Sequence, residues 1–567
     1  MPPGPGAGWR VRHGASNVPQ GNSHPRPEQT DVMTTATLFN HSYDPTTGRN
    51  PNAGPPPVRR IVIVGGGTAG WMTALILARS FIERGVEITL LESPAVGIIG
   101  VGEGSTPWLR GFFDSLGVEE SEWMPACHAT YKCGITFDGW STKPGFERYF
   151  HPFASMLDNL TLKQFVHNVD ARVNGADVHA HPDRFFISAR LAERRRAPKA
   201  PESFPFDIWH GYHFDAVLLG QFLHKKALER GVRYQSCHVT QANLAADGSI
   251  ASVSTGEGET IAADLFVDCS GFAGLLIEKA LHTPYVSFSN NLFNDAAVAL
   301  PTPIDGAIPS ETVSTALRHG WAWKIPLTSR YGNGYVYSSG FCTRDEAETE
   351  LRRHLGLLES DVEARHLKMR IGRVTRHWNR NCLAVGLAQG FIEPLEATAL
   401  LFIQQTAATF VEFLEKGDLS EAAHQRFNER VNAHFEGTRD YIVTHYKTNN
   451  REDTEYWRAN AANLNLSDEL KQLYAQWMSG KGIAAPVGQQ QLGKGYPVFS
   501  WYAIMAGMGI FPARGQLHRP NEREGIYKMA EIDDLIERSS ANYPDHRAAL
   551  GHIAPRRTGP SLQVYFF

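Results

Sequence analysis

The chain has 567 residues, of which 42% are hydrophobic and 20% charged, and this composition is typical of a globular protein with a sizeable core. A balance of 55 Lys and Arg against 59 Asp and Glu gives a net charge of −4, which argues against a nucleic-acid partner because phosphate binding needs clustered positive charge. No apolar run reaches the roughly 18 residues of a membrane span, and the six cysteines show no metal-binding spacing. We therefore expect a cytoplasmic protein with reduced thiols, no metal and no membrane partner.

The first segment, residues 1–57, is dominated by Pro, Gly, Asn, Ser and Thr and ends in three prolines. Such a composition buries too little apolar surface to order the chain, and the segment lacks the apolar stretch of a secretory signal. We expect a disordered tail before residue 58.

A buried strand followed by a glycine-rich turn comes next. Residues 61–64 are a β-branched run, 65–70 read GGGTAG, 71–84 are typical of a helix, and 87–92 are a second strand that ends in Glu92. Strand, glycine turn, helix, strand and acid within about 30 residues are the pattern of a dinucleotide-binding unit.

The three glycines of the GxGxxG pattern have separate roles. Gly65 permits the tight turn, Gly67 lets a pyrophosphate approach the backbone, and Gly70 lets the helix pack on the strand. The pyrophosphate would lie at the helix N-terminus, where free N–H groups favour anions, and the acid would bond a ribose hydroxyl. The predicted cofactor residues of this unit are Gly65, Gly67, Thr68, Ala69, Gly70 and Glu92.

Later segments favour FAD over NAD. Residues 214–230 are typical of a helix, 265–268 of a buried strand that runs into Cys-Ser-Gly, and 383–386 of another strand. The ends of the last two strands would approach the cofactor again, which a single nicotinamide-binding unit does not explain. Further cofactor contacts are predicted at Val239, Asp268, Leu387 and Leu400. From about residue 400 the pattern turns largely helical.

Five short strings occur in chain order: GGGTAGWM at 65–72, GVGE at 100–103, WAWKIP at 321–326, FIEPLE at 391–396 and DTEYWRAN at 453–460. With these strings the chain resembles the flavin-dependent tryptophan halogenases from about residue 61 to about residue 514. The resemblance implies an α/β fold with an FAD-binding Rossmann-like domain of the flavin monooxygenase type and a mainly helical substrate-binding subdomain. We expect the FAD domain at 58–420, with inserted substrate-wall segments at about 140–205 and 300–375, the helical subdomain at 421–540 and a C-terminal tail at 541–567.

The resemblance also implies an activity. In this family a separate flavin reductase delivers reduced FAD, which reacts with O2 and chloride to give hypochlorous acid. The acid then moves through an internal passage to the indole of tryptophan, and the WxWxIP segment at 321–326 lines the wall between flavin and substrate. A role in natural-product biosynthesis and a homodimer are further expectations at the level of the family.

The resemblance assigns catalytic and halide-binding positions. Lys132 matches the lysine that handles hypochlorous acid, and burial would lower its pKa. Glu396 matches the carboxylate that stabilises the cationic ring intermediate and takes its proton. Glu393 is expected to have a structural, hydrogen-bonding role. The backbone amides of Thr398 and Ala399 match the chloride site, although this chain has Ala at 397 and 399 where serine and glycine are common.

The resemblance also assigns an aromatic substrate pocket, because flat aromatic walls suit a flat electron-rich ring. Its predicted residues are His151, Phe153, Tyr446, Glu452, Tyr456 and Trp457. His445 stands where the family often has a tyrosine, so the grip on the amino-acid part is open. Peptide-borne tryptophan or another indole or pyrrole remains an alternative substrate. A flavin monooxygenase and a non-enzymatic binding protein of the same fold remain alternative functions.

Overall fold

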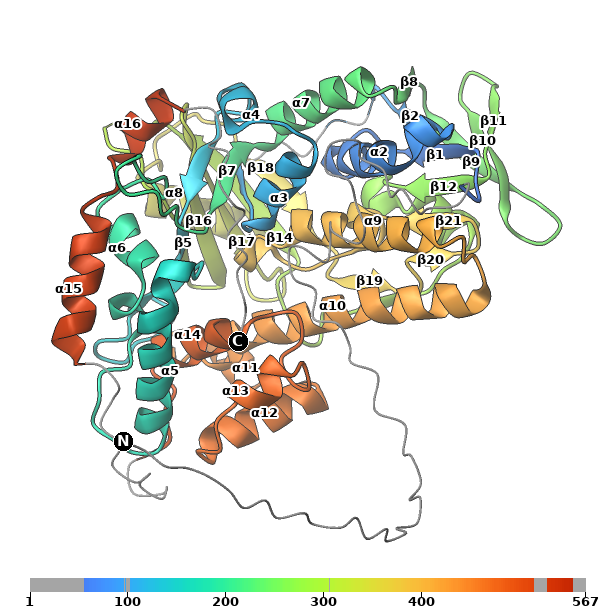
Figure 1. Cartoon of the computed structure of the whole chain (residues 1–567). Helices are drawn as coiled ribbons and strands as arrows, with labels where there is room; N and C mark the ends of the chain where they lie inside the picture. Colours follow the sequence, from blue (N-terminus) through green and yellow to red (C-terminus); the bar gives the residue numbers. More distant parts are fainter. Residues whose placement is uncertain (1–55, 96, 98–101, 305, 514–527, 554–567) are drawn as a thin grey trace, which may run out of the picture. The chain divides into compact units, whose positions relative to one another are not determined.

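The computed structural model describes residues 56–95, 97, 102–304, 306–513 and 528–553. The expected N-terminal tail therefore lies outside the described residues except for Pro56 and Pro57, and so do the first two residues of the GVGE string. Within the described ranges the strands form five sheets (Figure 1).

A mainly parallel sheet surrounds the first strand, because all but the first residue of that strand are buried and parallel strands need cover on both faces. The strand order is β20-β21-β12-β1-β2-β8, and only the edge strand β20 is antiparallel to its neighbour. The strands predicted at 61–64, 87–92, 265–268 and 383–386 all lie in this sheet. Its strands are β1 (Arg60–Val64), β2 (Glu87–Glu92), β8 (Arg233–Ser236), β12 (Leu265–Asp268), β20 (Trp378–Asn379) and β21 (Cys382–Ala384).

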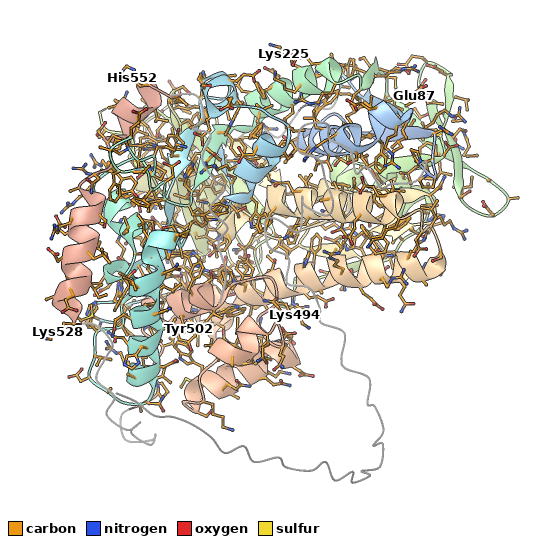
Figure 2. All side chains as sticks on the ribbon, in the orientation of Figure 1. Glu87, Lys225, Lys494, Tyr502, Lys528 and His552 are labelled. Carbon is orange, nitrogen blue, oxygen red and sulfur yellow. The ribbon has the colours of Figure 1, made fainter. Side chains whose placement is uncertain are left out.

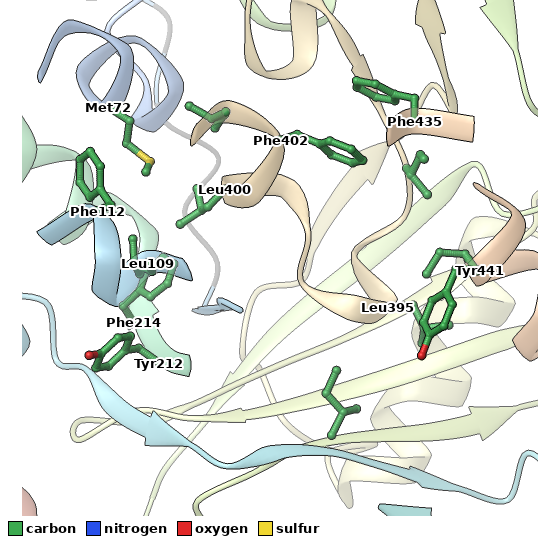
Figure 3. Packing of buried hydrophobic residues seen from close by; sticks show 14 of the residues in the cluster. Met72, Leu109, Phe112, Tyr212, Phe214, Leu395, Leu400, Phe402, Phe435 and Tyr441 are labelled. Carbon is green, nitrogen blue, oxygen red and sulfur yellow. The ribbon is translucent and has the colours of Figure 1, made fainter. Parts of the chain in front are cut away.

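Three helices pack together beside this sheet. α2 (Thr68–Phe81) contacts both α7 (Ala216–Glu229) and α9 (Ala399–Glu415), and a 3-10 helix at Ile82–Arg84 extends α2. The helix predicted at 71–84 thus begins three residues earlier, and the helix predicted at 214–230 begins two residues later, after a strand. Figure 3 shows Met72 of α2 and Leu400 of α9 in the apolar core formed there.

A second large sheet contains the WxWxIP segment as strand β16. Its strand order is β18-β14-β17-β16-β15-β5-β6, with β15 and β5 parallel and the other neighbours antiparallel. It joins most of the predicted wall segment at 300–375 to the chain around residue 140. Its strands are β5 (Gly134–Asp138), β6 (Arg148–Pro152), β14 (Ala296–Thr302), β15 (Thr312–Leu317), β16 (Gly320–Pro326), β17 (Tyr331–Tyr337) and β18 (Arg365–Lys368).

Small sheets complete the β-structure. β7 pairs antiparallel with both β3 and β4, so the end of the GVGE string and Lys132 lie on strands either side of β7. The strands of the small sheets are β3 (Gly102–Gly104), β4 (Thr130–Lys132) and β7 (Gly211–Asp215); β9 (Val239–Leu244), β10 (Ile250–Thr255) and β11 (Thr260–Ala262); and β13 (Tyr285–Ser287), β19 (Gly372–Val374) and β22 (Gly390–Phe391).

The described residues after 399 are largely helical, as predicted. α10 (Glu421–Lys447) lies alongside α9 (Figure 1), and the rings of Phe402 on α9 and Phe435 on α10 stack at 4.3 Å. The remaining helices are α3 (Trp108–Ser115), α4 (Glu120–Ala126), α5 (Asn159–Val173), α6 (Ile187–Glu193), α8 (Arg344–Leu355), α10 (Glu421–Lys447), α11 (Glu455–Ala462), α12 (Asp468–Met478), α13 (Ala484–Gly488), α14 (Val498–Gly507), α15 (Met529–Ser540) and α16 (His546–Gly551).

The expected C-terminal tail at 541–567 is wrong in its first part. α16 follows α15, and the buried His546 accepts a hydrogen bond from the backbone N–H of Tyr131 on β4. A buried aromatic residue, Tyr543, also packs in the main core. Residues 554–567 lie outside the described ranges. All the residues that the structure describes belong to one packed unit, so the change to helical structure near residue 420 separates no second body.

Many charged side chains lie on the outside of this unit. Figure 2 shows Lys225, Lys494 and Lys528 projecting from it, and all three are exposed. None of the helices in the described ranges combines the length and apolar character needed to span a bilayer.

Candidate active site

The glycine turn after β1 leaves room for a ligand at one position. A Cβ at Gly67 would meet nothing within 4 Å, whereas a Cβ at Gly65 or Gly70 would overlap backbone atoms. Gly67 is the N-cap of α2, and α2 has neither a capping side chain nor an acidic residue in its first turn. Free N–H groups beside open space suit a pyrophosphate, so the residues present fit the predicted dinucleotide.

Other segments converge on this turn. A Cβ at Gly66 would overlap the side chain of Glu92, which places that acid beside the turn. A Cβ at Gly386, where φ is +69°, would lie 2.6 Å from Cβ of Ala69. The 3-10 helix Gly386–Ala388, which holds the predicted contact Leu387, therefore reaches the start of α2.

Asp268 stabilises the local backbone. Its Oδ1 accepts from the N–H and hydroxyl of Ser270, and its Oδ2 accepts from the N–H groups of Leu276 and Ile277. These hydrogen bonds assign the carboxylate to the turn after β12, and the cofactor contact at Asp268 stays a prediction. Val239 is buried in a small core cluster.

Lys132 is a buried lysine, only 1% exposed, at the end of β4. Its Nζ lies 5.6 Å from the centre of the Phe153 ring, and no hydrogen bond or salt bridge to any described residue engages it. Burial lowers the pKa of Lys132 to about 8, and the Glu396 carboxylate acts in the opposite direction. The ammonium and the free amine are therefore both accessible near neutral pH.

The space beside Lys132 is bordered by small and hydrogen-bonded groups. A Cβ at Gly104 would lie 3.3 Å from Nζ of Lys132. His213 on β7 is held between Thr130, 3.0 Å from its Nδ1, and Thr312, 2.9 Å from its Nε2. These two hydrogen bonds fix the orientation of the His213 ring beside the lysine.

Glu396 ends a short 3-10 helix, Pro394–Glu396, and the chain then turns through Ala397 with φ +56°. The side chain is buried. Burial acts to raise the pKa of this carboxyl group, but His151, His445 and Lys132 outweigh it and hold the pKa below its ordinary value. Glu396 is thus a carboxylate at neutral pH, electrostatically coupled to Lys132.

A hydrogen-bond network surrounds Glu393. Its Oε2 accepts from the indole N–H of Trp321 at 3.0 Å, from Nδ2 of Asn294 at 2.8 Å and from the hydroxyl of Tyr446 at 2.7 Å. The hydroxyl of Tyr456 donates to Oδ1 of Asn294 at 2.9 Å. The carboxylate therefore binds the first tryptophan of the WxWxIP strand and the aromatic residues of α10 and α11 together.

The other end of the WxWxIP strand is tied to the lysine strand. The carbonyl oxygen of Pro326 accepts a hydrogen bond of 2.7 Å from the hydroxyl of Thr130. Trp321 and Trp323 are two residues apart, so both project from the same face of β16, and their ring centres are 6.2 Å apart. The strand is thus anchored beside Glu393 at one end and beside Lys132 at the other.

The structure brings three of the predicted substrate residues together, since the ring centre of Trp457 lies 6.2 Å from that of Tyr446 and 5.1 Å from that of Tyr456. His151 is buried, with Nε2 2.7 Å from the hydroxyl of Tyr441 and no hydrogen-bond partner for Nδ1 among the described residues. Trp457 is buried and donates to the carbonyl of Leu317. Glu452 is exposed, and no hydrogen bond joins its side chain to the other pocket residues in the described ranges.

The N-terminus of α9 suits an anion. Thr398 is its N-cap and Ala399 its first residue, with no capping side chain and no acid in the first turn. Neither backbone N–H donates a hydrogen bond to another described residue. Free amides directly after Glu396 are a fitting place for a halide.

Three residues that sequence reasoning did not assign belong to this region. Asn294 joins Glu393, Tyr446 and Tyr456, and Trp140 lies 5.3 Å from both Tyr446 and Trp457 between ring centres. His445 contacts Glu396, with Nε2 3.0 Å from Oε1. Only His445 had a signal in the sequence, as a departure from the tyrosine common at that place.

Known proteins with similar sequences and structures identify the family of this chain. A family model described as tryptophan halogenase matches residues 60–520. The chain belongs to the tryptophan halogenase family. A tryptophan 6-halogenase from Streptomyces toxytricini, SttH, is 37% identical over 80% of this chain and 90% of its own length. The tryptophan 7-halogenase RebH from Lentzea aerocolonigenes is 34% identical over 83% and 93%.

Solved structures confirm the fold class of this halogenase. Tar14, a tryptophan C-6 flavin-dependent halogenase from taromycin biosynthesis, superimposes with a TM-score of 0.77 at 35% identity, covering 87% of this chain and all of Tar14. The tryptophan halogenase is thus a flavin-dependent enzyme of the oxidoreductase type, with the predicted α/β Rossmann-like fold. Among its described residues no group of three or more His, Cys, Asp or Glu is arranged to hold a metal.

Proposed function

We propose that this halogenase chlorinates the indole ring of tryptophan at the buried site that contains Lys132 and Glu396. The observation that carries the proposal is the pairing of a buried lysine with a buried carboxylate, each of which shifts the pKa of the other. A buried, electrostatically coupled pair of this kind is characteristic of catalytic sites. The 6- and 7-halogenation named for SttH and RebH supports the choice of tryptophan.

The residues of the glycine turn, Glu92 and the Gly386–Ala388 segment would hold FAD. Bound reduced FAD, supplied by a separate reductase, would provide hypochlorous acid from O2 and chloride. The free amides of Thr398 and Ala399 bind the chloride, since a helix N-terminus favours an anion. The strand with Trp321 and Trp323 forms the partition between cofactor and substrate.

Lys132 and Glu396 divide the chemistry at the substrate. The ammonium of Lys132 hydrogen-bonds the hypochlorous acid, or its free amine accepts the chlorine, and a pKa of about 8 makes both forms available. The ring carbon attacks the chlorine, and the ring becomes a cation. With the ammonium form the O–Cl bond breaks and the hydroxide leaves as water with a proton from Lys132; with the chlorinated amine the N–Cl bond breaks and its electron pair stays on the Lys132 nitrogen. Glu396 stabilises that cation and removes its proton. His151, Phe153 and Trp457 hold the flat ring.

One observation favours a substrate other than free tryptophan. Glu452 is exposed, and the hydroxyl of Tyr446 donates to Glu393, so neither residue predicted to hold the amino-acid part is presented to the buried site. Peptide-borne tryptophan or a simple indole needs no such grip. The same chemistry on one of these substrates is therefore the second candidate.

A substrate panel tests both candidates. The purified protein is incubated with FAD, a flavin reductase, NADH, O2 and chloride, together with free tryptophan, tryptophan peptides, simple indoles or pyrroles. Mass spectrometry should show a chlorine isotope pattern on one class of substrate. Replacing Lys132 with Ala should abolish this product while oxidation of reduced flavin continues. An oxygenated product without chlorine would overturn the proposal in favour of a monooxygenase.

A further inference from the structure

Three side chains beside Lys132 form an unbroken chain of hydrogen bonds. The hydroxyl oxygen of Thr130 on β4 lies 2.7 Å from the carbonyl oxygen of Pro326, the last residue of β16, and 3.0 Å from Nδ1 of His213 on β7. Nε2 of His213 lies 2.9 Å from Oγ1 of Thr312 on β15. All three side chains are buried, so the direction of each hydrogen bond is set by its neighbours in the chain.

The carbonyl oxygen at one end fixes these directions. A carbonyl oxygen only accepts, so the single hydroxyl proton of Thr130 is donated to Pro326. The oxygen of Thr130 then accepts from Nδ1 of His213, which therefore carries a proton. A neutral imidazole has one such proton, so Nε2 presents a lone pair and accepts from the hydroxyl of Thr312. The oxygen of Thr312 is left with lone pairs only.

The His213 ring is neutral, as this assignment requires. Burial, with contributions from Lys132 and His546, holds the pKa of His213 well below its ordinary value. A charged ring would donate from both nitrogens, and the hydroxyl proton of Thr312 would then be free for another partner. The neutral ring therefore makes Thr312 a hydrogen-bond acceptor toward any further group.

The oxygen of Thr312 borders the same small space as the lysine nitrogen. A Cβ at Gly104 would lie 3.3 Å from Nζ of Lys132 and 3.6 Å from both Oγ1 of Thr312 and Cδ2 of His213. Glycine has no such atom, so a small molecule over Gly104 meets the lysine ammonium as a donor and Thr312 as an acceptor. Hypochlorous acid suits this pair of groups, because its oxygen accepts a hydrogen bond and its O–H donates one.

Resting on the proposed function, we propose that Thr312 is a catalytic residue that accepts the hydrogen bond from the O–H of hypochlorous acid, while the ammonium of Lys132 donates to its oxygen. Two contacts of opposite polarity fix the direction of the O–H bond. The chlorine is the remaining atom, and it is turned away from both side chains. Orienting a reagent in this way lowers the barrier to its transfer.

The chlorine transfer is balanced with these groups. An electron pair of the ring forms the C–Cl bond, and the O–Cl bond breaks with its electron pair on oxygen. The ring is oxidised and the chlorine is reduced. The oxygen keeps the hydrogen that is bonded to Thr312 and takes a proton from Lys132, so it leaves as water. Glu396 takes the ring proton, and one proton passed through water from Glu396 to Lys132 restores the starting charges.

Nuclear magnetic resonance tests the hydrogen-bond directions without turnover. The protein is labelled with 15N-histidine, and the signals of His213 are identified from their loss in His213→Gln. In the wild-type protein Nδ1 should show the shift of a nitrogen with a proton, and Nε2 that of a nitrogen without one. In Thr130→Val the proton on Nδ1 has no acceptor and should move to Nε2, whereas Thr130→Ser should keep the wild-type shifts. A proton on Nε2 in the wild type, or unchanged shifts in Thr130→Val, would overturn the assigned directions.

The yield of chlorinated product per reduced flavin oxidised tests Thr312 in the reaction, with tryptophan or indole as the substrate. Thr312→Val keeps the shape of the side chain but removes the acceptor, so this yield should fall roughly 10-fold with KM for the substrate unchanged. Thr312→Ser should recover at least half of the wild-type yield. Thr315→Val lies on the same strand with its side chain on the opposite face, and this matched control should behave as the wild type.

A further measurement separates the proposed role from a structural one. If Thr312 only held the His213 ring, Thr312→Val would let the ring turn and Nδ1 would lose its shift as a nitrogen with a proton. We expect the Nδ1 shift to stay as in the wild type while the yield falls. A changed Nδ1 shift together with the lower yield would overturn the direct role of Thr312.

The outcomes also separate the two proposals. A wild-type protein that oxidises reduced flavin but chlorinates no indole or pyrrole would overturn the proposed function, and the role of Thr312 with it. A chlorinating wild type and a Thr312→Val variant of equal yield would overturn the role of Thr312 alone. If Thr312→Val does not fold, Thr312→Ala, which also lacks the hydroxyl, replaces it with the same expectation.

Discussion

The indole N–H of Trp321 donates to Oε2 of Glu393 over 3.0 Å. Glu393 is the N-cap of the short 3-10 helix Pro394–Glu396, which ends in Glu396. The segment that presents the proposed base therefore also holds the first tryptophan of the partition. A shift of this segment would move both Glu396 and Trp321. The positions of the proposed base and of the proposed partition between flavin and substrate therefore depend on the same loop.

The three donors on Glu393 predict a large cost for its removal. Glu393→Ala leaves the buried N–H and O–H groups of Trp321, Asn294 and Tyr446 without their acceptor, and each such group costs about 1–3 kcal/mol. We expect the free energy of unfolding to fall by about 3 kcal/mol or more, measured by urea denaturation. Glu393→Gln retains one acceptor oxygen and should lose clearly less.

Glu429→Ala is the control for this measurement, because Glu429 is exposed on α10. Its stability should stay within about 0.5 kcal/mol of the wild type. Equal losses in Glu393→Ala and Glu429→Ala would contradict a structural role for the network.

The depressed pKa of Lys132 predicts that this lysine destabilises the fold. Its pKa falls from an ordinary 10.5 to about 8 on folding, so between these pH values the unfolded chain binds more protons than the folded protein. Stability must then rise with pH across this window. Lys132→Met should be more stable than the wild type by about 3 kcal/mol at pH 7, and the gap should close as the pH approaches 10.5.

Thermal or urea unfolding of both proteins from pH 7 upward checks this expectation, with Lys225→Met as the exposed control. The same Lys132→Met variant should form no chlorinated product. If Lys132→Met were less stable than the wild type at pH 7, burial of the charged lysine would not be what lowers the stability of the wild-type protein.

Gly104 controls the space next to the lysine nitrogen. Gly104→Ala would place a methyl group 3.3 Å from Nζ of Lys132 and 3.6 Å from Oγ1 of Thr312. The lysine can move aside, so stability should change by less than about 1 kcal/mol. Chlorination should fall by roughly 10-fold, because small misplacements of a catalytic group are costly, while flavin oxidation continues.

Product formation and flavin oxidation are followed in parallel to check the effect of Gly104→Ala. Gly551→Ala, where a Cβ would meet nothing within 4 Å, is the control and should leave both rates unchanged. If Gly104→Ala chlorinated at the wild-type rate, the space between Gly104 and Nζ of Lys132 would not be where the reaction takes place.

Two glycines of the turn should differ in their effects, because Gly67 borders the proposed cofactor site and Gly70 packs against the backbone. Gly67→Ala fills the open space where the pyrophosphate would lie, at a backbone φ of −72° that alanine adopts freely. FAD affinity, measured by fluorescence titration, should fall at least tenfold, while the unfolding temperature of the cofactor-free protein stays unchanged. Gly70→Ala overlaps the carbonyl of Gly65 and should lower that temperature instead. A Gly67→Ala protein that binds FAD normally would argue against the predicted placement.

Local sequence patterns predicted the parts of the molecule that depend on near neighbours. The strand at 61–64, the glycine turn, the helix and the acid at 92 could be foreseen because continuous apolar runs and glycine conformation act within a few residues. The tail expected at 541–567 failed in its first part, since polar residues such as His546 are buried by partners far along the chain. A weakly periodic segment does not reveal such partners.

By itself, the sequence determined the dinucleotide-binding pattern, the family resemblance and the positions of Lys132 and Glu396. Only the tertiary structure decided that His445 faces Glu396, that Trp321 is bound to Glu393 and that Glu452 points outward. The reason is physical: these contacts join strands, loops and helices separated by 49 to 72 residues, and packing rather than local conformation brings such side chains within reach of one another.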